Sequence, residues 1–271
     1  MKKIILLTVI SFTFILFTII VDKSNVKADK TFKIIPEKVS YYKNEYKSRY
    51  SQFAKKNPNL PMEDVITRVN IGLDNKYYTH TKISQHLNKI YILVNKYTFL
   101  PDNYIPNNLE FLDTTYSREG MSLVKVAKVN FEKMYEAAKK DGIKIRVMSS
   151  YRDYLYQIKL YNKYKQEDGE ENADKYSARP GFSEHQTGLC VDIDNGVLPY
   201  DSFEKSNSYK WMLDNSYKYG FIERYPRDKE DITGYIYEAW HYRYVGKKIA
   251  KYIHDYGITF DEYYVRFIEK N

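Results

Sequence analysis

The most apolar part of the chain lies at its start. Lys2 and Lys3 precede Ile4–Val21, a run without a charged residue, and Val26-Lys27-Ala28 then offers small residues at the two positions that a signal peptidase reads. The run is longer than the core of a usual signal peptide and just long enough to span a bilayer. We therefore expect residues 1–28 to be a signal peptide or an N-terminal membrane anchor. In either case the rest of the chain is expected outside the membrane.

A polar stretch follows this run. Residues 29–58 are rich in Lys and Tyr and end in Asn57-Pro58, a dipeptide typical of a linker. They predict a polar spacer that includes one helix over Tyr42–Lys55. We expect the compact domain to begin near Leu60 and to comprise residues 59–271.

Periodic apolar positions predict three helices beyond the spacer. In Ser122–Lys140 the apolar residues recur at steps of three and four, which places them on one face of a helix, and Gly142 then ends it. Two further helices are expected over Asp153–Lys165 and, closing the domain, over Lys247–Tyr256. The stripe of the first helix consists of Val124, Ala127, Phe131, Met134 and Ala138.

Three shorter segments predict strands. Ile143–Met148 alternates with a period of two, Leu189–Ile193 is apolar except for Asp192, and Tyr235–His241 is the third. Helices and strands are mixed without regular β-α-β repetition. The pattern therefore predicts an α+β fold, with a small antiparallel sheet and flanking helices.

Composition and charge narrow the class of protein. Hydrophobic residues make up 43% and charged residues 29% of the chain, so a full core can form. The net charge of +8 falls to +5 without residues 1–28, which carry four Lys and one Asp. The basic residues are scattered and match no nucleic-acid motif, so no nucleic-acid partner is expected. A single cysteine, Cys190, rules out an intramolecular disulfide.

Two polar clusters late in the chain carry the candidate chemistry. His185 precedes Asp192, which interrupts an apolar strand, and Glu238 comes three residues before His241. A buried carboxylate is costly unless it is paired or bound to a metal. Two His and one carboxylate make a three-ligand catalytic zinc site, and the other carboxylate is then free to take a proton from water. Taken singly, each residue also has an ordinary structural explanation, as a cap, a turn former or a salt-bridge partner.

Longer motifs surround these clusters: Ser149–Arg152, Gln157, Ser177–Gly188, Val191–Ile193 and Glu238–Gly246, with weaker pieces at Val69–Asp74, Leu93–Lys96 and Leu100–Tyr104. Over about residues 60–250 the chain resembles the zinc D-alanyl-D-alanine carboxypeptidases of the VanY type, within the M15 peptidase group. The resemblance implies a Hedgehog/DD-peptidase-like zinc peptidase fold. It also implies a hydrolase that acts on peptidoglycan stem peptides at the bacterial cell wall, and hence an extracytoplasmic protein, secreted or membrane-anchored.

The resemblance implies roles for individual residues. The Zn²⁺ ligands would be His185, Asp192 and His241, and Glu238 would be the general base that later protonates the leaving amine. Arg152 would stabilise the oxyanion or bind a carbonyl or carboxylate of the substrate. The substrate's C-terminal part would be hydrogen-bonded by Gln157 and Ser183.

One position departs from the family pattern. Cys190 stands where the family usually has a small residue such as Ala. Residues two apart on a strand share a face, so we expect the Cys190 thiol on the same side as Asp192, either close to the metal or as a small buried filler. The remaining histidines, His80, His86 and His254, match no motif and are expected in surface or capping roles.

Other classes of protein leave weaker traces in the sequence. Ser122 and Lys125 match the S-x-x-K pattern of serine peptidases, but no Lys-Thr-Gly occurs and the pair falls in a charged amphipathic helix. A non-catalytic wall-binding module that keeps the zinc is a second alternative, against which Glu238 argues. Within the enzyme class we expect a D,D-carboxypeptidase, with an L,D-carboxypeptidase acting on tetrapeptide stems as the alternative.

Overall fold

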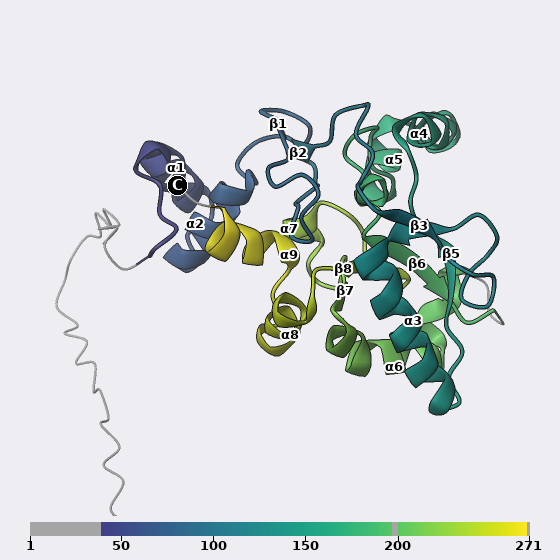
Figure 1. Cartoon of the computed structure of the whole chain (residues 1–271). Coiled ribbons are helices and arrows are strands. Elements are labelled where there is room, and N and C mark those ends of the chain that lie inside the picture. The colour runs from purple at the N-terminus through teal and green to yellow at the C-terminus, as the bar shows by residue number, and fades with distance from the viewer. Residues whose placement is uncertain (1–38, 197–199, 270–271) are drawn as a thin grey trace, which may run out of the picture. The chain divides into compact units, whose positions relative to one another are not determined.

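The centre of the molecule is a four-stranded antiparallel sheet. The computed structural model describes residues 39–196 and 200–269. The strand order is β5-β6-β8-β7, with β6 and β8 in the middle and fully buried. This sheet and the helices around it confirm the α+β prediction (Figure 1). The four strands are β5 (Arg146–Ser149), β6 (Cys190–Asp194), β7 (Phe221–Glu223) and β8 (His241–Tyr244).

Alternation along β6 separates the core from the polar face of the sheet. Val191 and Ile193 join the main apolar core, whereas Cys190 and Asp192 point to the opposite face. Helix α3 (Lys125–Lys140) covers the core face (Figure 1). Its stripe residues Ala127, Phe131, Met134 and Ala138 are each 0% exposed. The predicted apolar stripe is therefore what holds the helix on the sheet.

The predicted start of this helix is wrong by one short strand. Ser122–Val124 forms β4, which pairs with β3 (Leu109–Phe111), and the helix begins only at Lys125. The Val124 N–H donates to the Gly188 carbonyl oxygen at 2.9 Å. Backbone hydrogen bonds to segments distant in the sequence hold these residues in a strand instead of a helix, and periodicity alone does not reveal such bonds.

The strand predicted over Tyr235–His241 is also misplaced. Its residues up to Trp240 lie outside any strand, and β8 begins at His241. The Glu238 N–H donates to the Tyr225 carbonyl oxygen at 3.0 Å, and the Ile236 N–H donates to the Lys175 carbonyl oxygen at 2.9 Å. These backbone groups bond to the end of helix α5 (Glu170–Tyr176) and to the bend after β7 rather than to one neighbouring strand, so no ladder forms. The other two strand predictions overlap β5 and β6.

The remaining helices agree with the predictions in kind but not always in extent. Helix α4 (Tyr154–Asp168) begins after Asp153, whose side chain accepts a hydrogen bond from the Tyr156 N–H. The helix expected to close the domain, α8 (Lys247–Tyr256), has the predicted bounds but is followed by α9 (Phe260–Tyr263) and a π-helical turn, η6 (Tyr264–Ile268). Also present are α5 (Glu170–Tyr176), α6 (Asn207–Asn215), α7 (Glu230–Thr233), β1 (Lys82–Ile83), β2 (Thr98–Phe99) and the short turns η2 (Asn44–Tyr46), η3 (Glu184–Thr187), η4 (Tyr200–Lys205) and η5 (Ser216–Tyr219).

A helix that precedes Leu60 packs against the helix that follows it. Helix α1 (Lys47–Lys56), which falls within the helix predicted over Tyr42–Lys55 apart from its last residue, lies against α2 (Met62–Ile71). Tyr50 is fully buried between them, and its hydroxyl donates to Asn70 Oδ1 at 2.7 Å. The spacer and domain boundaries themselves stay predictions.

The predicted signal peptide or anchor, residues 1–28, lies outside the described residues. Within the described part of the chain, every helix is too short or too polar to cross a membrane.

Glu223 on β7 makes the stability of the fold depend on pH. It is partly buried and accepts a hydrogen bond from Tyr209 Oη at 2.8 Å, and burial raises the pKa of its carboxyl group to about 7. A carboxyl group whose folded pKa exceeds the unfolded value of about 4.3 stabilises the fold fully below that value, and this contribution is lost as the pH rises through 7.

We therefore expect Glu223→Gln to raise the free energy of unfolding by about 1–3 kcal/mol at pH 8 and to leave it nearly unchanged near pH 4.5, because the amide stays neutral throughout. Urea unfolding of both proteins at the two pH values measures this difference. An equal difference at both values would contradict the assigned ionisation.

Candidate metal centre and pocket

The register of the sheet brings Asp192 and His241 together. They are direct partners across the antiparallel pair β6·β8, and partners of this kind project from the same face. His241 Nδ1 lies 2.9 Å from Asp192 Oδ1. Two residues far apart in the sequence are thus adjacent because of strand pairing.

His185 reaches the same point from the loop before β6. It lies on η3, where the Ser183 side chain caps the turn by accepting the His185 N–H at 3.4 Å. The turn ends at Gly188, whose φ of +66° favours glycine, and an added Cβ would lie only 3.1–3.2 Å from three neighbouring side chains. His185 Nδ1 lies 2.5 Å from the Ser150 carbonyl oxygen, which can only accept, so Nδ1 carries a proton and Nε2 is the nitrogen that faces Asp192.

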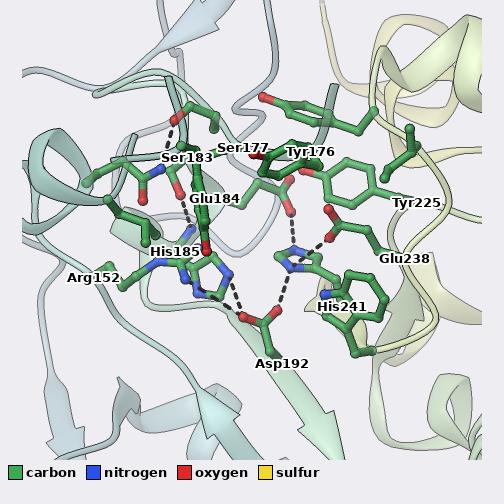
Figure 2. A pocket seen from close by; sticks show the side chains of 17 residues that line it. Arg152, Tyr176, Ser177, Ser183, Glu184, His185, Asp192, Tyr225, Glu238 and His241 are labelled. Carbon is green, nitrogen blue, oxygen red and sulfur yellow. Dashed lines mark hydrogen bonds and ion pairs between the residues drawn. The ribbon is translucent and has the colours of Figure 1, made fainter. Parts of the chain in front are cut away.

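The three side chains form a compact donor set (Figure 2). His185 Nε2 lies 3.3 Å from Asp192 Oδ2, and the centroids of the two imidazole rings are 5.0 Å apart. None of the three residues is more than 5% exposed. Two imidazole nitrogens and a carboxylate at these separations fit the ligand set of a catalytic Zn²⁺ ion.

The Cys190 thiol lies beside the two histidines. It is fully buried, and its Sγ atom and one nitrogen of each imidazole lie within 4.8 Å of one another. The expectation that it shares the face of Asp192 is confirmed. It does not line the pocket described below, whereas Asp192 does.

Glu238 approaches the donor set from the irregular segment before β8. Its Oε2 lies 3.9 Å from His241 Nδ1, and the residue is 7% exposed. Burial raises the pKa of this carboxyl group to about 7, although the positive charge of the neighbouring imidazoles opposes the shift. A carboxyl group with a pKa in this range is suited to accept and return a proton near neutral pH.

Arg152 borders the donor set. Its Nη1 donates to Ser149 Oγ at 3.2 Å and lies 3.9 Å from Asp192 Oδ2. The Nε atom is buried and has no hydrogen-bond partner among the described residues.

Gln157 presents a similar unpaired atom. Its amide nitrogen donates to the Ala178 carbonyl oxygen at 2.7 Å, whereas its buried Oε1 has no partner within the described chain. Unpaired buried polar atoms at a pocket are a sign that a ligand completes their bonding.

A cavity of about 290 Å³ opens onto these groups. All seven site residues named from the sequence line it, and Figure 2 shows His185, Asp192, Glu238 and His241 turned toward one another within it. The other lining residues, which the sequence did not single out as site residues, are Leu160, Tyr164, Tyr176, Ser177, Ala178, Glu184, Tyr225, Tyr235, Ile236 and Trp240.

Three charged residues next to the site were missed by sequence reasoning. Glu184 and Arg243 lie inside the quoted motifs without a role assigned to them, and Arg224 lies in no motif and looks like an ordinary surface arginine in the sequence. All three side chains are at most 1% exposed, and Glu184 Oε1 accepts from both arginines at 2.9 Å. Burial opposes ionisation of Glu184, yet the two arginines hold its pKa well below the usual range.

The fold and this donor set define a zinc metallopeptidase. Comparison with known proteins agrees: the model of the family described as "VanY: D-alanyl-D-alanine carboxypeptidase" matches residues 120–247. YodJ of Bacillus subtilis (strain 168), named as a carboxypeptidase, is 42% identical over 206 residues, which cover 71% of this chain and 76% of YodJ.

Two solved structures are similar along most of their length. The LdcB LD-carboxypeptidase superposes with a TM-score of 0.65 at 42% identity, covering 70% of this chain and 92% of LdcB. A variant of the vancomycin-resistance D,D-pentapeptidase VanY in complex with Zn(II) superposes with a TM-score of 0.56 at 34% identity. The superposition covers 64% of this chain and 97% of the VanY chain. The chain belongs to the VanY family of D-alanyl-D-alanine carboxypeptidases, and it is a zinc metallocarboxypeptidase.

Proposed function

We propose that this protein removes the C-terminal D-alanine from peptidoglycan stem peptides, acting as a D,D-carboxypeptidase on pentapeptide stems. The observation that carries the proposal is the convergence of His185, Asp192, His241 and Glu238 on one small cavity of a VanY-family chain. Ligand sites usually measure roughly 300–1,000 Å³. A cavity of about 290 Å³ therefore suits the short end of a peptide.

His185, Asp192 and His241 would hold the zinc. Asp192 is preferred to Cys190 because its carboxylate lies within 3.3 Å of a nitrogen of each imidazole and lines the cavity. When bound, zinc supplies Lewis acidity, which activates water for attack on a carbonyl group.

Glu238 would move the proton. Its carboxylate would take a proton from the attacking water and pass it to the amine of the departing D-alanine, as general base and then general acid. The buried position raises the pKa of this carboxyl group to about 7, which is near the value at which both transfers are easy.

Arg152 would bind the substrate's terminal carboxylate or the oxyanion that forms at the carbonyl. A guanidinium group offers a planar fork for a carboxylate, and one fixed donor to an oxyanion is typically worth about 3 kcal/mol of barrier. Gln157 and Ser183 would hydrogen-bond the C-terminal part of the peptide. The unpaired Gln157 Oε1 supports this role, because an amide N–H of the substrate would satisfy it.

An L,D-carboxypeptidase acting on tetrapeptide stems is the second candidate. The LdcB LD-carboxypeptidase is more similar to this chain than the VanY D,D-pentapeptidase, at 42% against 34% identity. Both activities use the same centre, so the difference lies in which terminal residues the cavity accepts.

The purified protein with stem pentapeptide and stem tetrapeptide distinguishes the candidates. We expect loss of one D-alanine from the pentapeptide, read by mass spectrometry, with complete loss of activity in the presence of a chelator and recovery when zinc is added. Cleavage of the tetrapeptide instead would move the protein to the L,D class. Absence of cleavage of both would contradict the proposal and favour cross-link cutting or a wall-binding module.

We also propose that the protein works outside the cytoplasm, secreted or anchored in the membrane at the cell wall. The apolar run Ile4–Val21 behind Lys2 and Lys3 supports this location. Mass analysis of the protein from culture medium and from membranes tests it. A chain that keeps Met1 and stays in the cytoplasmic fraction would refute the proposal.

A further inference from the structure

A network of buried charged side chains lies behind the metal centre. Glu184 Oε1 accepts from Arg224 Nε and from Arg243 Nη1, each at 2.9 Å. Arg224 Nη1 in turn donates to Asp261 Oδ2 at 2.6 Å. Two carboxylates and two guanidinium groups balance in charge, and none of the four side chains is more than 1% exposed.

One end of this network faces a residue of the donor set. Glu184 Oε2 lies 3.6 Å from His241 Nε2, and neither atom has a hydrogen-bond partner within the described chain (Figure 2). This separation is longer than a normal hydrogen bond, but it is short enough for electrostatic attraction between the carboxylate and the imidazole N–H. A histidine that offers Nδ1 to a metal carries its proton on Nε2, and a carboxylate is the usual acceptor that fixes the ring.

The other end of the network lies beyond the segment that matches the family model. Asp261 is on α9, after residue 247, and its Oδ1 accepts from Asn95 Nδ2 at 2.8 Å. Arg243 Nη2 donates to the Ile90 and Ile92 carbonyl oxygens, at 3.2 and 2.7 Å. The network therefore joins the metal centre to the C-terminal helix and to the loop before β2.

Stability alone is a weak reason for such an arrangement. Buried ion pairs lose about as much in desolvation as they gain in attraction, and apolar replacements are often as stable. A network that ends on the open nitrogen of a metal-binding histidine has a second effect, because it holds the imidazole ring in one orientation.

We infer that Asp261 is a positioning residue for His241, acting through Arg224 and Glu184, so that helix α9 is part of the metal centre. The inference rests on the proposed zinc site. Without the Asp261 carboxylate, Arg224 keeps only its bond to Glu184, so this guanidinium group and the Glu184 carboxylate are fixed less firmly, and the His241 ring with them.

The test compares Asp261→Asn with Glu269→Gln. The amide keeps the size of Asp261 and its bond from Asn95 but removes the charge that holds Arg224. Glu269 is a matched control, because it lies on the same C-terminal segment and binds Lys43 at 2.9 Å and Lys82 at 2.5 Å, without a link to the network.

We expect Asp261→Asn to bind zinc about 10–100-fold more weakly in competition with a chelator and to lower kcat by a similar factor, with KM nearly unchanged. The absorption spectrum of the cobalt-substituted protein should change as well. Glu269→Gln should lower the unfolding temperature but keep the zinc affinity and the cobalt spectrum of the unchanged protein. If Asp261→Asn instead behaves like Glu269→Gln, the network only holds the fold and the inference is overturned.

Arg224→Lys decides the question if Asp261→Asn does not fold. Lysine keeps the positive charge but lacks the fork that bridges two carboxylates, so a similar loss of zinc affinity is expected and an unchanged affinity would overturn the inference. Zinc affinity and the cobalt spectrum are measured without substrate. A protein that cleaves neither stem peptide would therefore refute the proposed activity and still test the role of Asp261.

Discussion

Glu238→Gln lowers kcat by about 10²–10⁴-fold, the usual contribution of a positioned general base, while zinc stays bound. Glutamine keeps the shape of the side chain beside His241 but cannot accept a proton from water. The carboxylate is 3.9 Å from His241 Nδ1 and lines the cavity, whereas the nitrogen and oxygen atoms of the donor set come from other residues. Turnover of stem peptide and zinc content by atomic absorption measure the two effects separately.

Glu223→Gln is the matched control for this variant. Burial raises the pKa of Glu223 to about 7, as it does for Glu238, but Glu223 lies on β7 and does not line the cavity. We expect the control to keep its turnover. A Glu238→Gln protein with undiminished kcat would show that another group takes the proton.

His241→Ala removes zinc and activity together. The donor set keeps only His185 and Asp192, and the buried Glu184 Oε2 loses the imidazole that it faces at 3.6 Å. Mutation of a residue that only hydrogen-bonds a metal ligand typically lowers metal affinity about 10–100-fold. The loss of a ligand itself therefore weakens zinc binding by more than about 100-fold. Chelator competition and metal analysis after dialysis measure the change.

His254→Ala is the control for this second variant. His254 lies on α8 and stacks on Tyr217 at 3.8 Å between ring centroids, away from the cavity. The His254→Ala protein should bind zinc with the affinity of the unchanged protein. Full zinc occupancy in His241→Ala would contradict the proposed ligand set, and Cys190 would then be the first donor to test in its place.

Local patterns in the sequence predicted much of the scaffold. The stripe of α3 and the bounds of α8 follow from apolar spacing, because a helix must bury one face wherever it packs. Asp192 was noticeable because it interrupts an apolar strand, and a buried carboxylate needs a partner. Boundaries failed where distant backbone supplied the hydrogen bonds, as at Val124, which bonds to Gly188, and at Glu238, which bonds to Tyr225.

The chemistry of the centre was determined by the sequence, and its assembly by the tertiary structure. Residue types and motifs were enough to nominate His185, Asp192, Glu238 and His241, since few other side chains bind zinc or move protons at neutral pH. Only the register of β6 against β8 placed Asp192 opposite His241. Only the fold showed that Arg224 and Asp261 are buried behind the centre. A buried charge is stabilised by oppositely charged side chains that are distant in the sequence, and the residues next to it in the sequence do not identify those partners.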